Sequence, residues 1–160
     1  MEYLFLRRKR NTFGSQRQRD LLFKAAEKYW ERECSVNKMD GREIDLNIYK
    51  TILYFLEIKQ VFLDSKLSLK KLSTMIETNQ TYVSNVVNRY FNCNLKELLN
   101  RYRVEYAKEL LTDGRCPLEN IPERSGFASR SAFYAAFNKL AGSTPVRYMT
   151  YSRMKLEQGY

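Results

Sequence analysis

The chain has 160 residues, 44% of them hydrophobic, which suits one domain, or a compact pair of subdomains with an extra arm, around a buried core. It carries 28 Lys and Arg against 18 Asp and Glu, a net charge of +10. A surplus of this size indicates a polyanionic partner, either nucleic acid or an acidic membrane surface. The sequence contains no His, the commonest general base and metal ligand, which argues against most enzymes and metal sites.

The three cysteines Cys34, Cys93 and Cys116 are scattered and form no C-x-x-C pair. An odd, scattered set argues against a disulfide framework and against a zinc site, and is typical of a reducing compartment. No apolar run approaches the roughly 20 residues that a membrane-spanning helix needs. We therefore expect a cytoplasmic protein with no cofactor and no metal.

The first 45 residues form a basic arm with one expected helix. Residues 3–6 are apolar and residues 7–10 are all Arg or Lys, which is typical of the cytoplasmic flank of a membrane helix and equally of an arm that contacts DNA. Apolar residues at helical spacing over residues 22–30 predict an amphipathic helix. This helix either packs on the rest of the domain or serves to couple or dimerise the protein.

Apolar residues recur at helical spacing through the rest of the chain, and no alternating strand pattern is found. We expect helices over residues 46–63, 69–76, 80–90, 95–111, 118–124 and 129–140, followed by a last turn through residue 148. Ser68 is a good N-cap for the short second helix, and Gly114 closes the long one. The expected fold class is all-α.

The second half of this pattern repeats the first about 50 residues later. Val83 and Val87 correspond to Phe133 and Phe137. The spacing predicts two helix-turn-helix subdomains in tandem, joined by one long linking helix. That helix of about 17 residues would span about 25 Å and could hold two recognition helices about one DNA turn apart.

In a helix-turn-helix unit the second helix lies in the DNA major groove, where amides, hydroxyls and Arg match the base edges. The expected base contacts are Asn79, Gln80, Thr81, Ser84, Asn85, Asn88, Ser129, Arg130, Ser131 and Tyr134. The expected phosphate contacts are Arg89, Lys139 and Arg147. Acidic residues, which would repel phosphates, are absent from the exposed faces of both second helices, whereas the linking helix carries Glu97, Glu105 and Glu109.

Each of these assignments has a structural alternative. Asn79, Thr81 and Ser129 stand near helix starts, where such side chains serve either as N-caps or as base contacts. Asn85 and Asn88 lie inside their helix, where capping does not explain them. The alternative for the three cations is a solvated surface.

A set of residues between positions 67 and 149 resembles the DNA-binding domain of the AraC/XylS family of bacterial transcription regulators. The residues that carry the resemblance are Leu69, Leu72, Ser73, Tyr82, Val83, Ser84, Arg103, Val104, Ala107, Leu110, Leu111, Ile121, Gly126, Phe127, Ser129, Ser131, Ala132, Phe133, Phe137, Asn138, Lys139, Gly142, Thr144, Pro145 and Tyr148. Residues 78–84 and 129–134 are most similar to a Bacteroidetes-type branch, in which such domains are often the output end of larger sensors.

The resemblance implies binding to double-stranded promoter DNA at an asymmetric site and activation of transcription through RNA polymerase. The chain is then either a short, stand-alone regulator or the output portion of a longer protein. In the second case the upstream partner would be a sensor domain or a membrane anchor, which would tether the protein to the inner membrane. A dimer could form through the N-terminal helix. The domain boundaries expected are 1–45 for the arm, 46–150 for the DNA-binding domain and 151–160 for the tail. Within the domain we expect a first unit at 46–94, the linking helix at 95–112 and a second unit at 117–150.

The sequence departs from the family pattern at several positions. Glu77 and Asn92 stand where the family often has Gly, so the first turn could be shaped differently. Pro122 removes a main-chain N–H, so we expect the short helix of the second unit to start late or to be distorted. The small Ala135 and Ala136 would limit base contact to a thymine methyl. The first unit is therefore expected to contribute more specificity.

Two rival classes fit less well. An enzyme acting on nucleic acid would need a base, a nucleophile or a metal site, and neither His nor clustered acids nor paired Cys supply one. A protein-interaction module would use the basic N-terminal residues on membrane lipids instead of DNA.

Overall fold

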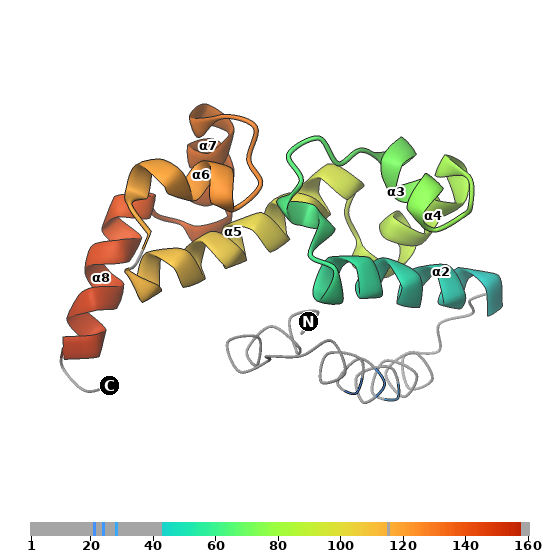
Figure 1. The fold of residues 1–160 in the computed structure, drawn as a ribbon, viewed down its shortest axis with the longest axis horizontal. Helices are drawn as coiled ribbons and strands as arrows, with labels where there is room; N and C mark the ends of the chain where they lie inside the picture. Colours follow the sequence, from blue (N-terminus) through green and yellow to red (C-terminus); the bar gives the residue numbers. More distant parts are fainter. Residues whose placement is uncertain (1–20, 22–23, 25–27, 29–42, 115, 158–160) are drawn as a thin grey trace.

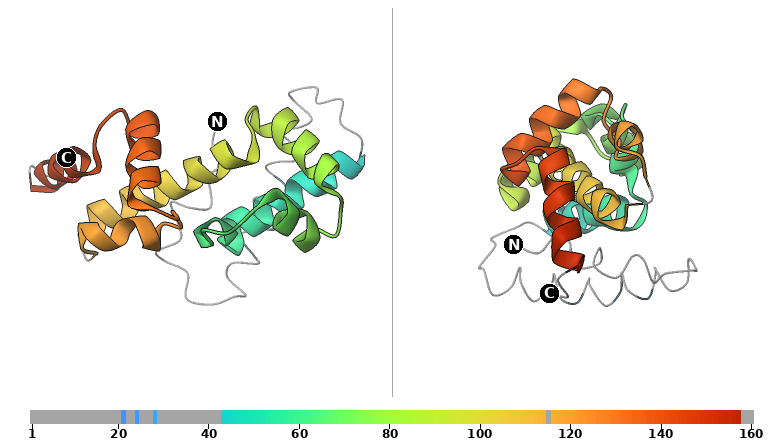
Figure 2. Two further views of the ribbon diagram at one scale, coloured as in Figure 1. Left: turned by 90° about the horizontal axis from the view of Figure 1, so that it is seen from above. Right: turned by 90° about the vertical axis from the view of Figure 1, so that its left-hand side faces the viewer.

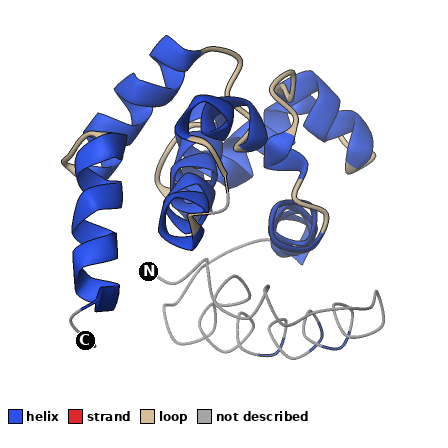
Figure 3. Ribbon diagram, turned by 60° about the vertical axis from the view of Figure 1, so that its left-hand side comes forward, coloured by secondary structure: helices blue, strands red, loops and turns tan. Residues whose placement is uncertain are grey.

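The computed structural model describes residues 21, 24, 28, 43–114 and 116–157. The basic arm and most of its expected helix therefore lie outside the described residues. Within the described part every regular element is helical and none is a strand, which confirms the all-α prediction (Figure 3). The elements in chain order are α2 (Glu43–Leu53), η2 (Tyr54–Ile58), η3 (Val61–Leu63), α3 (Leu69–Met75), α4 (Gln80–Phe91), α5 (Leu95–Asp113), η4 (Leu118–Asn120), α6 (Ile121–Arg124), α7 (Arg130–Ala141) and α8 (Pro145–Glu157).

The long helix α5 runs through the middle of the molecule, with the first unit packed at one end and the second at the other (Figures 1 and 2). Two separate clusters of buried apolar residues lie along it. The first cluster includes Leu98 and Tyr102 of α5, and the second includes Val104 and Leu111. The buried face of the helix therefore changes between Tyr102 and Val104, and the residue at the change is Arg103.

The first cluster is built by α2, α3, α4 and the N-terminal half of α5, and it differs from the prediction near its start. The expected continuous helix over residues 46–63 is wrong: α2 gives way to the π-helical turn η2, and the helix ends there. Gln60 then adopts a left-handed conformation with φ 54°, and the 3₁₀ turn η3 follows. The break lets the fully buried Phe62 pack on Tyr102 of α5, with the ring centroids 5.5 Å apart.

Side-chain caps begin most of the helices at the positions that the sequence predicts. Ser68 Oγ accepts a hydrogen bond from a main-chain N–H in the first turn of α3. Asn94 and Glu97 form a reciprocal capping box at the start of α5. Thr144 Oγ1 accepts a hydrogen bond from a main-chain N–H of α8 at 3.3 Å. These caps satisfy N–H groups that a helix end leaves without a partner, and they fix where each helix begins.

The two turns that end α3 and α4 use side chains where the second unit uses glycines. Glu77 and Asn92 have φ values of 59° and 52°, in the left-handed region. Gly126 and Gly142, at the corresponding turns, have φ values of 85° and 67°. The first unit therefore keeps the same kind of turn and does not reshape it, although the left-handed conformation is unfavourable for Glu.

The short first helix of the second unit starts late, as predicted from Pro122. The 3₁₀ turn η4 precedes it, and α6 contains four residues with Pro122 in the first turn, where no N–H is needed. The buried Ser125 closes this helix because its hydroxyl donates a hydrogen bond to the carbonyl oxygen of Ile121 at 2.6 Å.

The C-terminal helix is longer than predicted. The sequence predicts a last turn ending at Tyr148, whereas α8 continues to Glu157. Tyr148 and Met149 pack on the second cluster, but Tyr151 and Met154 are 59% and 54% exposed. The pattern of core-facing residues therefore ends before the helix does, which is why the sequence did not reveal its length.

Replacing Glu77 with Gly should stabilise the protein. The change removes a left-handed conformation that costs a side chain roughly 1–2 kcal/mol, offset in part by the greater backbone freedom of Gly in the unfolded chain. We expect the free energy of unfolding in urea to rise by about 0.5–1 kcal/mol. Glu77→Ala is the control, because it removes the same side chain and keeps the strained conformation; an equal gain from Ala would contradict the conformational explanation.

Candidate nucleic-acid interface

Helix α4 presents a polar, acid-free face opposite its buried side. Val83, Val86 and Val87 are at most 1% exposed and pack into the first cluster. At 3.6 residues per turn, Thr81, Asn85 and Asn88 lie on the opposite side, and all three are exposed. Gln80 is also exposed and Ser84 is half-buried, so both lie beside this face. The six predicted contacts of the first unit are therefore on the surface, five on α4 and Asn79 just before it.

Two of the predicted base contacts act as helix caps. Asn79 Oδ1 accepts a hydrogen bond from the main-chain N–H of Tyr82 at 2.9 Å. Ser129 Oγ accepts one from the N–H of Ala132 at 3.1 Å. Capping occupies these side-chain oxygens locally, which favours a structural role for Asn79 and Ser129. Thr81 is not the cap residue, because Asn79 holds that position.

Helix α7 is the counterpart of α4 in the second unit, with Phe133 and Phe137 fully buried. Ser131 and Arg130 are exposed at its start. Tyr134 is half-buried one turn on, and the guanidinium of Arg130 lies 5.7 Å from the centre of its ring. The stacked pair holds the Arg130 side chain against the helix surface.

The structure corrects one expectation for α7 and adds one residue. Ala136 is buried at 8% exposure against the second cluster, so it is a core residue; Ala135 is exposed. Asn138 is exposed and occupies the position in α7 that Asn88 occupies in α4. Asn88 and Asn138 are related by the repeat of about 50 residues in the sequence. A comparison of the two halves position by position would therefore have identified Asn138.

The three predicted phosphate contacts are exposed cations, two of them in weak ion pairs. Arg89 Nη1 lies 3.5 Å from Asp45 Oδ2, and Lys139 Nζ lies 3.8 Å from Glu97 Oε1. Arg147 is exposed near the start of α8. Ion pairs of this length on the surface contribute about 0–1 kcal/mol, so a phosphate can replace the carboxylate at little cost.

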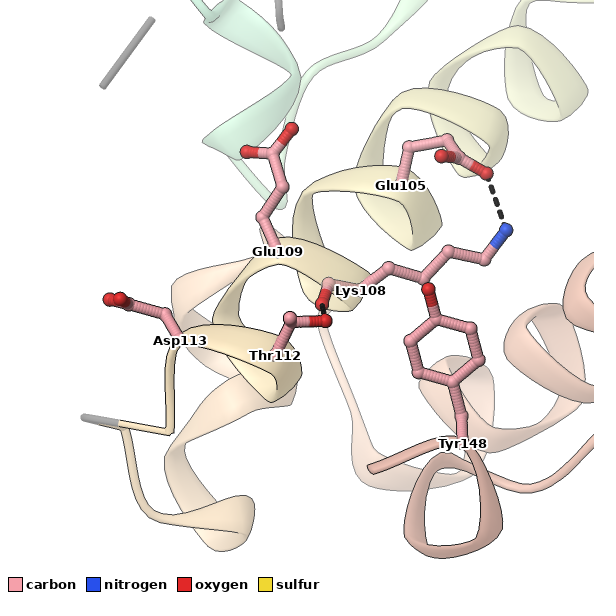
Figure 4. A pocket seen from close by; sticks show the side chains of 6 residues that line it. All are labelled: Glu105, Lys108, Glu109, Thr112, Asp113 and Tyr148. Atoms are coloured by element: carbon pink, nitrogen blue, oxygen red, sulfur yellow. Dashed lines mark hydrogen bonds and ion pairs between the residues drawn. The ribbon is translucent and has the colours of Figure 1, made fainter. Parts of the chain in front are cut away.

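A different surface of α5 carries most of the acidic side chains near these helices. Glu105, Glu109 and Asp113 line an open hollow of about 440 Å³ between α5 and α8, with Lys108 and Tyr148 (Figure 4). Lys108 Nζ binds Glu105 at 2.6 Å. Three carboxylates against one ammonium make this hollow unfavourable for phosphates, in contrast to the exposed faces of α4 and α7.

Residues 62–64, where η3 passes into a loop, are held by a side chain of α5. Arg103 of α5 is 9% exposed, and its Nε and Nη2 donate hydrogen bonds to the carbonyl oxygens of Phe62 and Asp64 at 2.8 and 2.9 Å. Burial lowers the pKa of the Arg103 guanidinium, and the charge of Asp64 acts in the opposite direction. The pKa of the Asp64 carboxyl is lowered, first by its hydrogen bond with Lys71 and then by one from the main-chain N–H of Lys66.

Two other features are absent from the described part of the chain. Among those residues no group of His, Cys, Asp and Glu side chains is arranged to hold a metal ion. In the same part of the chain no helix has the length and apolar character needed to cross a membrane.

Residues 72–151 match a protein family described as a helix-turn-helix domain. The chain belongs to the AraC-type helix-turn-helix family, a family of DNA-binding transcription regulators. This confirms the resemblance found in the sequence. The C-terminal domain of AraT, a response regulator from Geobacillus stearothermophilus, has a similar structure, with a TM-score of 0.58 and 25% identity. The similarity covers 69% of this chain and 86% of that domain.

Two curated regulators are related to this AraC-type chain in sequence. The melibiose operon regulatory protein of Escherichia coli K12 is 25% identical over 92 residues, which are 58% of this chain and 30% of that protein. The probable transcriptional regulator LumQ of Photobacterium leiognathi is 29% identical over 91 residues, 57% of this chain and 37% of that protein. The match therefore spans about a third of each regulator's length.

The cap at the start of α4 can be tested apart from any contact with DNA. Asn79→Ala removes the acceptor for the Tyr82 N–H and should lower the free energy of unfolding by about 1 kcal/mol. Asn79→Asp keeps an acceptor at the same position and should retain stability to within about 0.3 kcal/mol. Urea unfolding followed by circular dichroism measures both, and equal losses from Ala and Asp would rule out the capping role.

Proposed function

We propose that this chain is a sequence-specific transcription regulator that inserts α4 and α7 into successive major-groove segments of promoter DNA and activates transcription. The observation that carries the proposal is the pair of exposed, acid-free helix faces at corresponding positions of the two units. Family membership supports DNA binding in general. The related regulators are named for roles in transcription, not for enzymatic activity.

The length of α5 supports contact with two groove segments by one chain. Its 19 residues span about 28 Å. Successive major-groove segments on one side of the duplex are about 34–36 Å apart. Since α4 and α7 belong to the clusters on different halves of α5, this one helix holds both of them in one chain (Figure 2).

The two recognition helices differ in the side chains they offer to DNA. The exposed face of α4 carries Asn85, whereas the corresponding position in α7 is Ala135. An amide can form two hydrogen bonds with adenine, but a methyl group offers only an apolar contact with thymine. We therefore propose that the first unit supplies more of the sequence preference and that the second contributes more to anchoring, through Lys139 and Arg147.

The relatives are longer than the match, so the partners of the whole protein are part of the proposal. We propose that RNA polymerase is the partner in activation and that a sensor domain or an anchor outside the described residues supplies the signal. Dimerisation through residues 22–30 belongs to the same proposal. A promoter target places the DNA-binding domain in the cytoplasm.

Replacing Asn85 with Ala is the direct test of sequence reading. A binding site is first selected from random duplexes, and the affinities for this site and its single-base variants are then measured. Asn85→Ala should reduce discrimination at one or two base pairs by about 1–3 kcal/mol each, while affinity for unrelated DNA stays the same. The reciprocal variant Ala135→Asn should create a new preference in the half-site bound by α7. If the wild-type chain binds every duplex equally, the proposal is wrong.

A reporter gene behind the selected site tests the direction of regulation. Expression of the wild-type protein should raise transcription, and Asn85→Ala should reduce the increase because the preference for the site is weaker. A fall in transcription with the wild-type protein would show repression instead of activation.

The proposed phosphate contacts predict a different response. Lys139→Gln and Arg147→Gln should each weaken binding to all sequences alike and reduce the slope of log affinity against log salt by about 1. Titrations at several salt concentrations measure the slope. Lys50→Gln on α2 is the control for loss of one positive charge, because Lys50 is not among the proposed contacts. A change in base preference on mutation of Lys139 would contradict its assignment to phosphate.

A further inference from the structure

The two units meet at a joint formed by residues 62–64, Arg103, Gly126 and Phe127. Arg103 approaches from α5 and donates hydrogen bonds to the carbonyl oxygens of Phe62 and Asp64, as described above. The same guanidinium lies 5.8 Å from the centre of the Phe127 ring, which belongs to the second unit. One buried side chain therefore contacts the loop of the first unit and the turn of the second.

Gly126 brings the turn of the second unit directly against the same loop. A Cβ atom at this position would lie 2.4 Å from the carbonyl oxygen of Phe62 and 2.8 Å from the Cα of Leu63. Both neighbours are main-chain atoms, so no side-chain movement could make room. The backbone of the second unit thus rests on the carbonyl group that Arg103 holds in place.

Besides the shared helix α5 and this joint, an exposed ion pair links the two units, and it is weaker than the joint. The two apolar clusters are separate, and the face of α5 that is buried changes at Arg103. The ion pair between Lys139 of α7 and Glu97 at the start of α5 is 3.8 Å long, and its side chains are 74% and 46% exposed. The joint therefore combines buried, hydrogen-bonded and closely packed contacts at the point where α5 passes from one unit to the other.

We propose that Arg103 is a positioning residue that sets which separation of two DNA half-sites the protein accepts. The inference rests on the proposed function, because it assumes that α4 and α7 each contact a half-site. Arg103 does not contact DNA in this proposal. It fixes the loop at residues 62–64, Gly126 rests on that loop, and the orientation of α7 relative to α4 follows.

The geometry of DNA makes such a constraint measurable. Inserting one base pair between the half-sites moves the second one by about 3.4 Å along the axis and rotates it by about 35° around it. A rigid joint leaves α7 out of the groove at the altered spacing. A loosened joint lets α7 follow the groove, at the cost of weaker binding to the natural spacing.

The test compares three variants on a series of duplexes. Arg103→Lys keeps the charge and cannot reproduce both hydrogen bonds, and Arg103→Met keeps much of the apolar stem and has no donor. Arg101→Met is the matched control, because Arg101 is exposed on the same helix and its loss changes the net charge equally. The duplexes carry the selected site with its natural spacing, with one base pair added or removed, and with the second half-site scrambled.

We expect the wild-type protein and Arg101→Met to bind the duplex with the natural spacing about tenfold or more tightly than the duplexes with altered spacing. This is the loss of affinity that removal of one good base contact produces. Both Arg103 variants should lower this preference to about threefold or less. Their affinity for the duplex with the scrambled half-site should stay within about twofold of wild type, a spread ordinary for unperturbed binding. Circular dichroism of each variant shows that the helices are retained.

The outcomes separate this inference from the proposed function. If the wild-type protein prefers no sequence, the proposed function fails. If it prefers its site but tolerates all spacings, or if both Arg103 variants keep the wild-type spacing preference, the positioning role is wrong. Should Arg103→Met fail to fold, Arg103→Lys and Phe127→Leu carry the same comparison. Equal loss of half-site and full-site affinity in those variants would assign Arg103 a purely structural role and overturn the inference.

Discussion

The fold depends on one helix serving two hydrophobic cores that do not merge. Helix α5 buries Tyr102 in the first cluster and Val104 in the second, on different sides of its axis. Each unit is thus small, and the half of α5 that it covers completes its core. Since α5 is a single helix, the two units cannot separate along it. Rotation between them is restrained where Arg103 and Gly126 engage residues 62–64, because that is where the helix passes from one core to the other.

The two units form the same kind of turn with different residues. The turn before each second helix needs a left-handed residue, and the first unit supplies Glu77 where the second has Gly126. In the second unit Gly has a further reason, since the Phe62 carbonyl oxygen leaves no room for a Cβ. Glu77 is tolerated because its side chain is exposed on the surface. A sequence difference at corresponding turns therefore reflects the surroundings of each turn and not its shape.

Much of the arrangement could be predicted from the sequence, because it depends on local signals. Helical periodicity, the cap at Ser68 and the glycine closing α5 located the elements of both units to within a few residues. The break at Gln60 could not be found in this way, since it exists to turn Phe62 under α5 and no breaker residue marks it. The length of α8 was not predicted because the exposed Tyr151 and Met154 end the pattern of core-facing residues before the helix ends. The role of Arg103 was equally hidden, as its acceptors are main-chain oxygens about 40 positions away.

The candidate interface shows a similar division between local and tertiary information. Capping by Asn79 depends on a main-chain N–H three residues away, and the sequence indicated capping as one of two alternatives for this residue. Ala135 and Ala136 look equivalent in the sequence, but only the packing of α7 on α5 shows that the first faces solvent and the second the core. The same packing brings Asn138 to the surface in the place of Asn88. In each unit, the face that is buried on α5 determines which face is exposed, so the core determines which residues are available to DNA. The joint at Arg103 then determines how the exposed faces of the two units are oriented relative to each other.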